Sequence, residues 1–144
     1  MKHNYVLRAA LAASFALWQT CAFAAGAERP RAATVNQLFE KDLSGVPGKE
    51  LLMLTVEYIP GGASLPHRHD AQVFVYVLEG ELNMQVAGGP VVTLRPGQTF
   101  YESPTDVHTI SANASKIAPA KILVCMVKDK AAPVTREVAP AAMP

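Results

Sequence analysis

The stretch that decides the fold runs from Gly61 to Gly80 and reads GGASLPHRHDAQVFVYVLEG. Its second half is dense in β-branched and aromatic residues between Val73 and Leu78, which favours a β-strand. Turn-forming glycines stand at both ends of the stretch. His67 and His69 are two residues apart, so in an extended chain their side chains point to the same face. The stretch therefore predicts a strand preceded by two histidines that face the same way.

The sequence on either side of this stretch also predicts β-structure. Strands are expected at residues 51–59, 73–78, 82–86, 91–94, 99–102, 107–111 and 121–128, separated by turns that contain Gly or Pro. Residues 35–43 could form a short helix or an extended arm, and their spacing leaves both open. No long amphipathic helix follows Leu51. Short strands with regular turns predict an all-β sandwich or barrel.

Three histidines remain in the chain beyond its apolar N-terminus: His67, His69 and His108. If the strand that begins at His108 lies beside the His67–His69 pair, three imidazoles can bind one ion. Neutral imidazole suits Zn, Cu, Fe and Ni. The alternative is that the three are scattered surface histidines.

The spacing of these histidines and of the glycines around them resembles the cupin superfamily. Gly61, five further residues and His67-Arg68-His69, with Gly80 eleven positions after His69, are similar to the first cupin motif. Gly97, with His108 eleven positions later, is similar to the second. The resemblance covers roughly residues 51–128. It implies a jelly-roll barrel of two sheets, with a site for one divalent metal ion inside its mouth.

Three positions depart from the family pattern. The metal-binding glutamate that usually follows the histidine pair is replaced by Val73, the motif-two proline is displaced to Pro104, and the position of the usual asparagine is held by Ala112. Three neutral imidazoles would leave the double charge of an ion uncompensated. Such a site should favour an anionic small molecule as its ligand or substrate.

Two residues near the second motif are candidates for acid–base catalysis, Glu102 and Tyr101. Alternation places Glu102 on the same face as Phe100, and Tyr101 on the opposite face. The simpler interpretation of Glu102, which we favour, is a solvated strand end. Arg68, between the two histidines, should face away from them.

The N-terminus has the pattern of a secretory signal peptide over residues 1–24. Lys2 and Arg8 are followed by an apolar run, and Ala22-Phe23-Ala24 offers small residues where a signal peptidase cuts. An uncleaved anchor is the alternative. The expected organisation is an N-terminal arm over 25–50, a barrel domain over 51–130 and a flexible tail over 131–144. The protein is then expected to be periplasmic or secreted.

Charge and cysteine content exclude several classes of function. Removing Lys2 and Arg8 from the 13 basic side chains leaves 11, against 12 acidic ones. A near-neutral chain without basic clusters does not predict binding to nucleic acid or to a membrane surface. One remaining cysteine, Cys125, cannot form an internal disulfide and is expected to be a buried, inert thiol.

Two functions from different classes fit these observations. The first is a metal-dependent, dioxygenase-like oxidoreductase; the second is a non-catalytic periplasmic module that binds a metal or a small ligand. A metal-free cupin is a third, and the presence of all three motif histidines argues against it. A homodimer is expected from the family resemblance, since small cupins often exchange edge strands.

Overall fold

The computed structural model describes residues 32–139. The predicted signal peptide and the last five residues of the predicted tail lie outside the described residues. Over the described range the chain contains no helix, and therefore none long and apolar enough to cross a membrane. Its strands are β1 (Ala33–Asp42), β2 (Lys49–Tyr58), β3 (His67–Arg68), β4 (Ala71–Glu79), β5 (Leu82–Val86), β6 (Val92–Leu94), β7 (Thr99–Glu102), β8 (His108–Asn113), β9 (Ala120–Asp129) and β10 (Arg136–Glu137).

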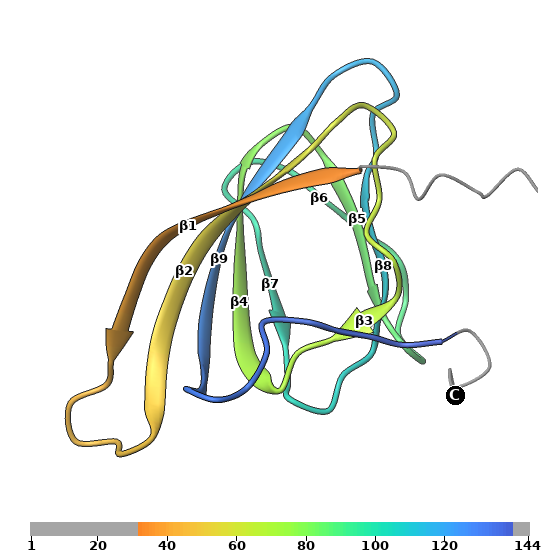
Figure 1. Cartoon of the computed structure of the whole chain (residues 1–144). Helices are drawn as coiled ribbons and strands as arrows, with labels where there is room; N and C mark the ends of the chain where they lie inside the picture. Colours follow the sequence, from red (N-terminus) through yellow and green to blue (C-terminus); the bar gives the residue numbers. More distant parts are fainter. Residues whose placement is uncertain (1–31, 140–144) are drawn as a thin grey trace, which may run out of the picture.

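The strands form two five-stranded sheets that face each other (Figure 1). The first sheet has the order β1-β2-β9-β4-β7 and the second the order β10-β3-β8-β5-β6. Every pairing is antiparallel. Strands that lie far apart in the sequence are therefore direct neighbours, β2 with β9 and β3 with β8. This is the all-β jelly-roll architecture that the sequence predicts.

The core lies between the two sheets and follows the period-two pattern of the strands. Along β4, Val73, Val75 and Val77 are buried, while Phe74 and Tyr76 point outward and are about half exposed. Although β4 carries apolar side chains on both of its faces, only those on one face enter the core. The same alternation along β9 leaves Cys125 on the outer face, partly exposed, so the expectation of a buried thiol is wrong.

Residues 33–42 of the predicted N-terminal arm form an edge strand. β1 pairs with β2 along nearly its whole length, from Ala33 opposite Tyr58 to Asp42 opposite Glu50. Of the two forms that the sequence allows for residues 35–43, the extended one is therefore observed. Most of β1 is exposed, which explains why its sequence carries no clear periodic signal.

The turn after β4 requires a glycine at residue 80, the last residue of the stretch from Gly61 to Gly80. Its φ is +72°, in the left-handed region, and an added Cβ would lie 2.5 Å from the Pro119 carbonyl oxygen. Both the backbone conformation and the close approach of the 119–120 segment require the missing side chain. The turn into β5 is thus fixed at this residue.

One charged pair is buried at an end of the barrel. Glu50 and Lys128 are direct cross-strand partners, their side chains are each 6% exposed, and Lys128 Nζ lies 2.6 Å from Glu50 Oε1. The ammonium also donates to the carbonyl oxygens of Asp129 and Ala132. All three of its donors therefore have partners, which a buried ammonium requires.

Candidate metal centre

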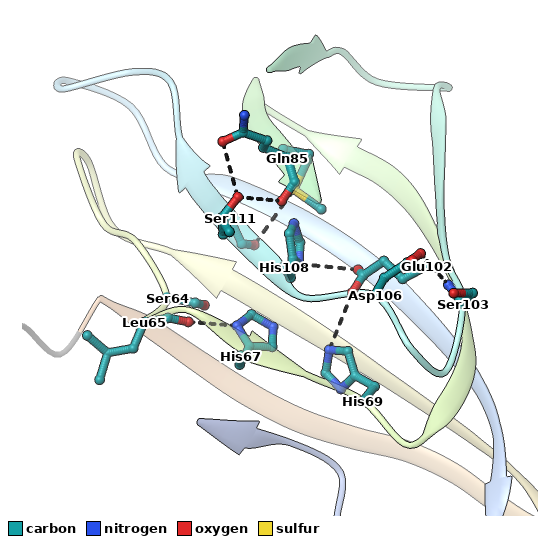
Figure 2. A network of polar contacts seen from close by, with 12 residues as sticks. Ser64, Leu65, His67, His69, Gln85, Glu102, Ser103, Asp106, His108 and Ser111 are labelled. Carbon is teal, nitrogen blue, oxygen red and sulfur yellow. Dashed lines mark hydrogen bonds and ion pairs between the residues drawn. The ribbon is translucent and has the colours of Figure 1, made fainter. Parts of the chain in front are cut away.

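The pairing of β3 with β8 brings the three predicted histidines together (Figure 2). His67 is the direct cross-strand partner of His108. The ring centre of His67 lies 4.9 Å from that of His69 and 5.1 Å from that of His108. All three are buried, whereas Arg68 between the first two is exposed. The prediction that His67 and His69 share one face, with Arg68 pointing away, is confirmed.

A β-bulge turns His108 into the barrel. Ser111 and Ile110 pair with Met84 and Gln85, but the next partner, Val86, lies opposite His108 rather than opposite Thr109. In a regular strand Thr109 would take the inward place and His108 would point outward. The displaced Thr109 hydroxyl lies 3.3 Å from the Gln85 carbonyl oxygen and 3.1 Å from its amide oxygen. The extra residue is thus held in place, and the third imidazole faces the other two.

Backbone carbonyls fix the orientation of two of the rings. His67 Nδ1 lies 2.7 Å from the Leu65 oxygen and His69 Nδ1 lies 2.5 Å from the Val134 oxygen. A carbonyl oxygen can only accept, so each Nδ1 must carry the proton and donate it. Each Nε2 is then left with a free lone pair, which is the form of histidine that binds metals.

Glu102 adds a carboxylate to the three imidazoles. It is 2% exposed, its Oε1 lies 3.3 Å from His108 Nδ1, and its Oε2 lies 3.8 Å from His69 Nε2. The interpretation as a solvated strand end is therefore wrong. Glu102 is the cross-strand partner of Val73, and partners in an antiparallel pair place their side chains on the same face. Glu102 therefore places a carboxylate on the sheet face where Val73 stands in the position of the usual glutamate.

Tyr101, the second predicted catalytic residue, does not face the site. Alternation along β7 turns its ring to the outer face of the first sheet, where it is half exposed. Its ring packs 5.4 Å from that of Phe74, and its hydroxyl donates to the amide oxygen of Gln72. By the same alternation Phe100 points inward and stacks on His108. The structure removes Tyr101 from the set of candidate catalytic residues.

Burial sets the protonation of the site. It raises the pKa of Glu102 from 4.5 to about 7, and the charge of Asp106 adds to the rise. It lowers the pKa of His108 to about 3, with smaller contributions from His67 and His69. Burial also lowers the pKa values of those two histidines. At a pH between the pKa of His108 and that of Glu102, both side chains are neutral, so their contact is not an ion pair. The imidazoles are ready to act as neutral ligands at ordinary pH.

The chemistry of the donor atoms suits a bound cation. Glu102 Oε2 and His108 Nε2 are buried without a hydrogen-bond partner, a costly arrangement unless something else satisfies them. The 3.8 Å between Glu102 Oε2 and His69 Nε2 is within the span of about 4.2 Å that two ligands of one ion can reach at about 2.1 Å each. Within residues 32–139, no three His, Cys, Asp or Glu side chains already surround one point at coordinating distance. The described side chains would therefore have to move before three of them could hold one ion.

The segment after β9 closes over the histidines, which sequence reasoning missed. β10 pairs with β3, with Glu137 opposite His67, and Arg136 forms an ion pair of 2.5 Å with Asp70. Residues 131–139 of the predicted flexible tail thus contain a short strand that contacts β3. The sequence gives no sign of this contact because His69 is held by the backbone carbonyl oxygen of Val134. Any residue at that position would provide the same atom.

A cavity of about 420 Å³ opens beside this cluster between the two sheets. The histidines and Glu102 line part of it, and much of the remaining wall is aliphatic. Val134, Thr135 and Glu137 line it from the C-terminal segment. Fold and site together define a class of protein, a small jelly-roll barrel with three histidines and a carboxylate gathered against an internal cavity.

The sequence comparison gives the family. The family model of the cupin domain matches residues 54–126, just over half of the chain. The chain belongs to the cupin family, as its motifs predict. No curated protein matches the chain.

Solved structures show the same fold. An oxalate oxidase in complex with the substrate analogue glycolate is 26% identical, with a TM-score of 0.54, and the match covers 69% of this chain and 52% of that one. A cupin-2 domain protein from Rhodospirillum rubrum is 25% identical, with a TM-score of 0.59, covering 78% and 69%. A DMSP lyase from Ruegeria pomeroyi is 20% identical, with a TM-score of 0.62, covering 80% and 56%, and at that identity the likeness concerns the fold alone. The chain spans about half the length of the oxalate oxidase.

Proposed function

We propose that this protein is a metal-dependent cupin that holds one divalent transition metal ion and binds a small organic anion in its cavity. His67, His69 and His108 would hold the ion, with Glu102 as the carboxylate. The observation that carries the proposal is the pair of buried polar atoms without partners, Glu102 Oε2 and His108 Nε2, beside two imidazoles whose Nε2 atoms are free. Nitrogen ligands with one carboxylate suit Fe, Zn, Cu or Ni.

The reaction class that we propose is oxidation of the anion, of the dioxygenase type. A bound ion would supply a Lewis acid and, if it is iron, a relay of electrons to oxygen. The protein's part is to fix the imidazoles through the Leu65 and Val134 carbonyls and to keep water out with the aliphatic wall. The Glu102 carboxylate would reduce the charge of the site from two to one, which still attracts an anion.

A non-catalytic binding module is the second candidate. Of the two predicted acid–base groups only Glu102 faces the cavity, while Tyr101 is turned outward. A carboxylate engaged with a metal ion is not free to serve as a general base. This observation favours binding over acid–base catalysis, although it leaves oxidation untouched. In either case we propose that the protein works outside the cytoplasm, because residues 1–24 have the signal-peptide pattern.

The test is metal content. The chain from Ala25 onward, purified without a histidine tag, is expected to hold about one equivalent of metal by mass spectrometry, and the His67→Ala/His69→Ala variant to lose it. Arg68→Ala is the matched control, because this side chain lies between the two histidines and points away from them. No metal in any of the three proteins, after reloading with Fe, Zn, Cu and Ni, would refute the proposal.

Metal identity then separates the two candidates. Iron directs the next assay to oxygen uptake with small enols and phenols, and uptake that requires His67 and His69 supports the oxidase. Zinc or copper without any turnover, combined with tight binding of a small anion, supports the binding module.

A further inference from the structure

The cavity has a second polar group besides the histidine cluster. The hydroxyl cluster, which we define as Tyr58, Ser64 and Ser111, lines the same cavity. Tyr58 Oη lies 2.9 Å from Ser64 Oγ and 2.7 Å from Ser111 Oγ. Tyr58 and Ser111 are 2% and 4% exposed. The three hydroxyls are therefore in contact with one another, with those of Tyr58 and Ser111 buried and that of Ser64 at the partly exposed side of the cluster.

The hydroxyl cluster has one proton more than its internal contacts use. Three hydroxyls carry three protons, and the two contacts within the cluster use two of them. The described residues offer one further partner, the Met84 sulfur, 3.7 Å from Ser111 Oγ, and a thioether is a weak acceptor. Burial raises the pKa of the Tyr58 phenol, so that group also keeps its proton at neutral pH. The cluster can thus donate one stronger hydrogen bond than it makes.

The hydroxyl cluster lies at a fixed distance from the metal centre along one strand. Ser111 and His108 both point inward from β8, opposite Met84 and Val86 of β5. Two register positions correspond to about 7 Å along a strand. Aliphatic side chains, among them Leu54, Val75 and Ile122, line the same cavity. A ligand that reaches both polar groups therefore needs an apolar body of this length.

The charge of the cavity wall limits which functional group of a ligand can contact the hydroxyl cluster. None of the described residues that line the cavity is Lys or Arg. A second carboxylate would therefore be buried without a cation, which is costly. A neutral acceptor oxygen, such as a ketone, needs only the donor that the hydroxyl cluster offers.

We propose that Tyr58, Ser64 and Ser111 form a second polar subsite, which donates a hydrogen bond to a neutral oxygen on the far end of a mostly apolar organic acid. The acid's carboxylate lies at the histidines and Glu102, so this inference rests on the proposed function and specifies its ligand class. The ligand is then a keto acid or a similar acid with one remote neutral oxygen, rather than a dicarboxylate or a plain fatty acid.

The test compares matched acids on the zinc-loaded protein by titration calorimetry. The γ-, δ- and ε-keto acids are titrated against straight-chain fatty acids with the same number of carbon atoms. At the chain length that spans the cavity, the keto acid is expected to bind about three- to tenfold tighter, the equivalent of one net hydrogen bond. This preference should disappear in Ser111→Ala and in Tyr58→Phe. It should persist in Ser115→Ala, whose hydroxyl accepts from backbone amides outside the cavity.

Thermal melting shows whether Ser111→Ala and Tyr58→Phe are folded. If one of them is not, the other still tests the inference. The inference is overturned if no keto acid binds tighter than its fatty acid, or if the preference survives both variants. A parent protein that holds zinc but binds neither class of acid overturns this inference and leaves standing only the metal-binding part of the proposed function. A parent that takes up no zinc overturns the proposed function as well, and measuring the metal content first tells these results apart.

Discussion

Replacing Glu102 by Gln should stabilise the metal-free protein at high pH, although it removes a group from the proposed site. The pKa of Glu102 is raised from 4.5 to about 7 by burial and by Asp106. A folded-state pKa above the unfolded one means that its contribution to stability is fully present below pH 4.5 and is lost as the pH rises through about 7. At about 1.4 kcal/mol per pKa unit, the cost of the ionised carboxylate reaches about 3 kcal/mol. Gln has nearly the same shape and does not ionise.

The assay is urea denaturation of metal-free protein, followed by circular dichroism, on either side of the Glu102 pKa. Glu102→Gln is expected to be more stable than the parent by up to about 3 kcal/mol well above that pKa, and nearly equal to it well below, where both side chains are neutral. Glu57→Gln, on the exposed side of β2, is the control and should change little at either pH. A variant that is less stable than the parent at high pH, or a difference that does not depend on pH, would refute the reasoning.

With zinc bound, the parent should have the advantage over Glu102→Gln. The carboxylate that destabilises the metal-free barrel should attract the cation, so Glu102→Gln is expected to weaken zinc binding by about ten- to hundredfold. A chelator competition assay at a pH above the Glu102 pKa measures this. Equal zinc affinity in the two proteins would mean that Glu102 does not belong to the metal centre.

Three further perturbations follow from the same structure. Truncation after Pro133 removes the carbonyl of Val134 that holds His69; zinc affinity should fall about tenfold or more while the circular dichroism spectrum keeps its β-form, and an unchanged affinity would show that the segment plays no part. Zinc affinity of the parent should fall about tenfold per pH unit below the pKa of Glu102, because the carboxyl proton must leave before the ion binds. Glu102→Gln should lose this pH dependence, since the pKa values of the histidines are lowered. Parallel pH profiles of the two proteins in competition titrations would contradict this. Lys128→Met should cost about 3–5 kcal/mol in urea denaturation by leaving Glu50 buried and unpaired, and Lys128→Met/Glu50→Leu should recover much of the loss; a double variant no better than the single one would count against the pair.

The sequence predicts the regular strands well because each has its own local signal. Residues 82–86 and 99–102 match β5 and β7 at both ends, since alternation and Gly-Pro turns bound them on both sides. β3 and β10 are two residues long. No periodic pattern exists over so short a length, so their pairing cannot be predicted from sequence.

The candidate site is predicted only in part, because its completeness depends on register. His67 and His69 face one way by spacing alone. The inward turn of His108 depends on a bulge that displaces Thr109, and nothing local marks it. Alternation places Glu102 and Tyr101 on opposite faces of β7, but it does not say which face is inward. The sequence therefore offers both residues as catalytic candidates, and the structure retains one.

The pairing of Val73 with Glu102 has a consequence for how such proteins are grouped. The two positions lie 29 residues apart in the sequence but opposite each other in the sheet. A carboxylate can move from one to the other by two compensating substitutions and still reach the same point in space. A search that looks for the glutamate within the first motif would set this chain aside as incomplete. A search that also examines the cross-strand neighbour would find a carboxylate, Glu102, on the same face of the sheet.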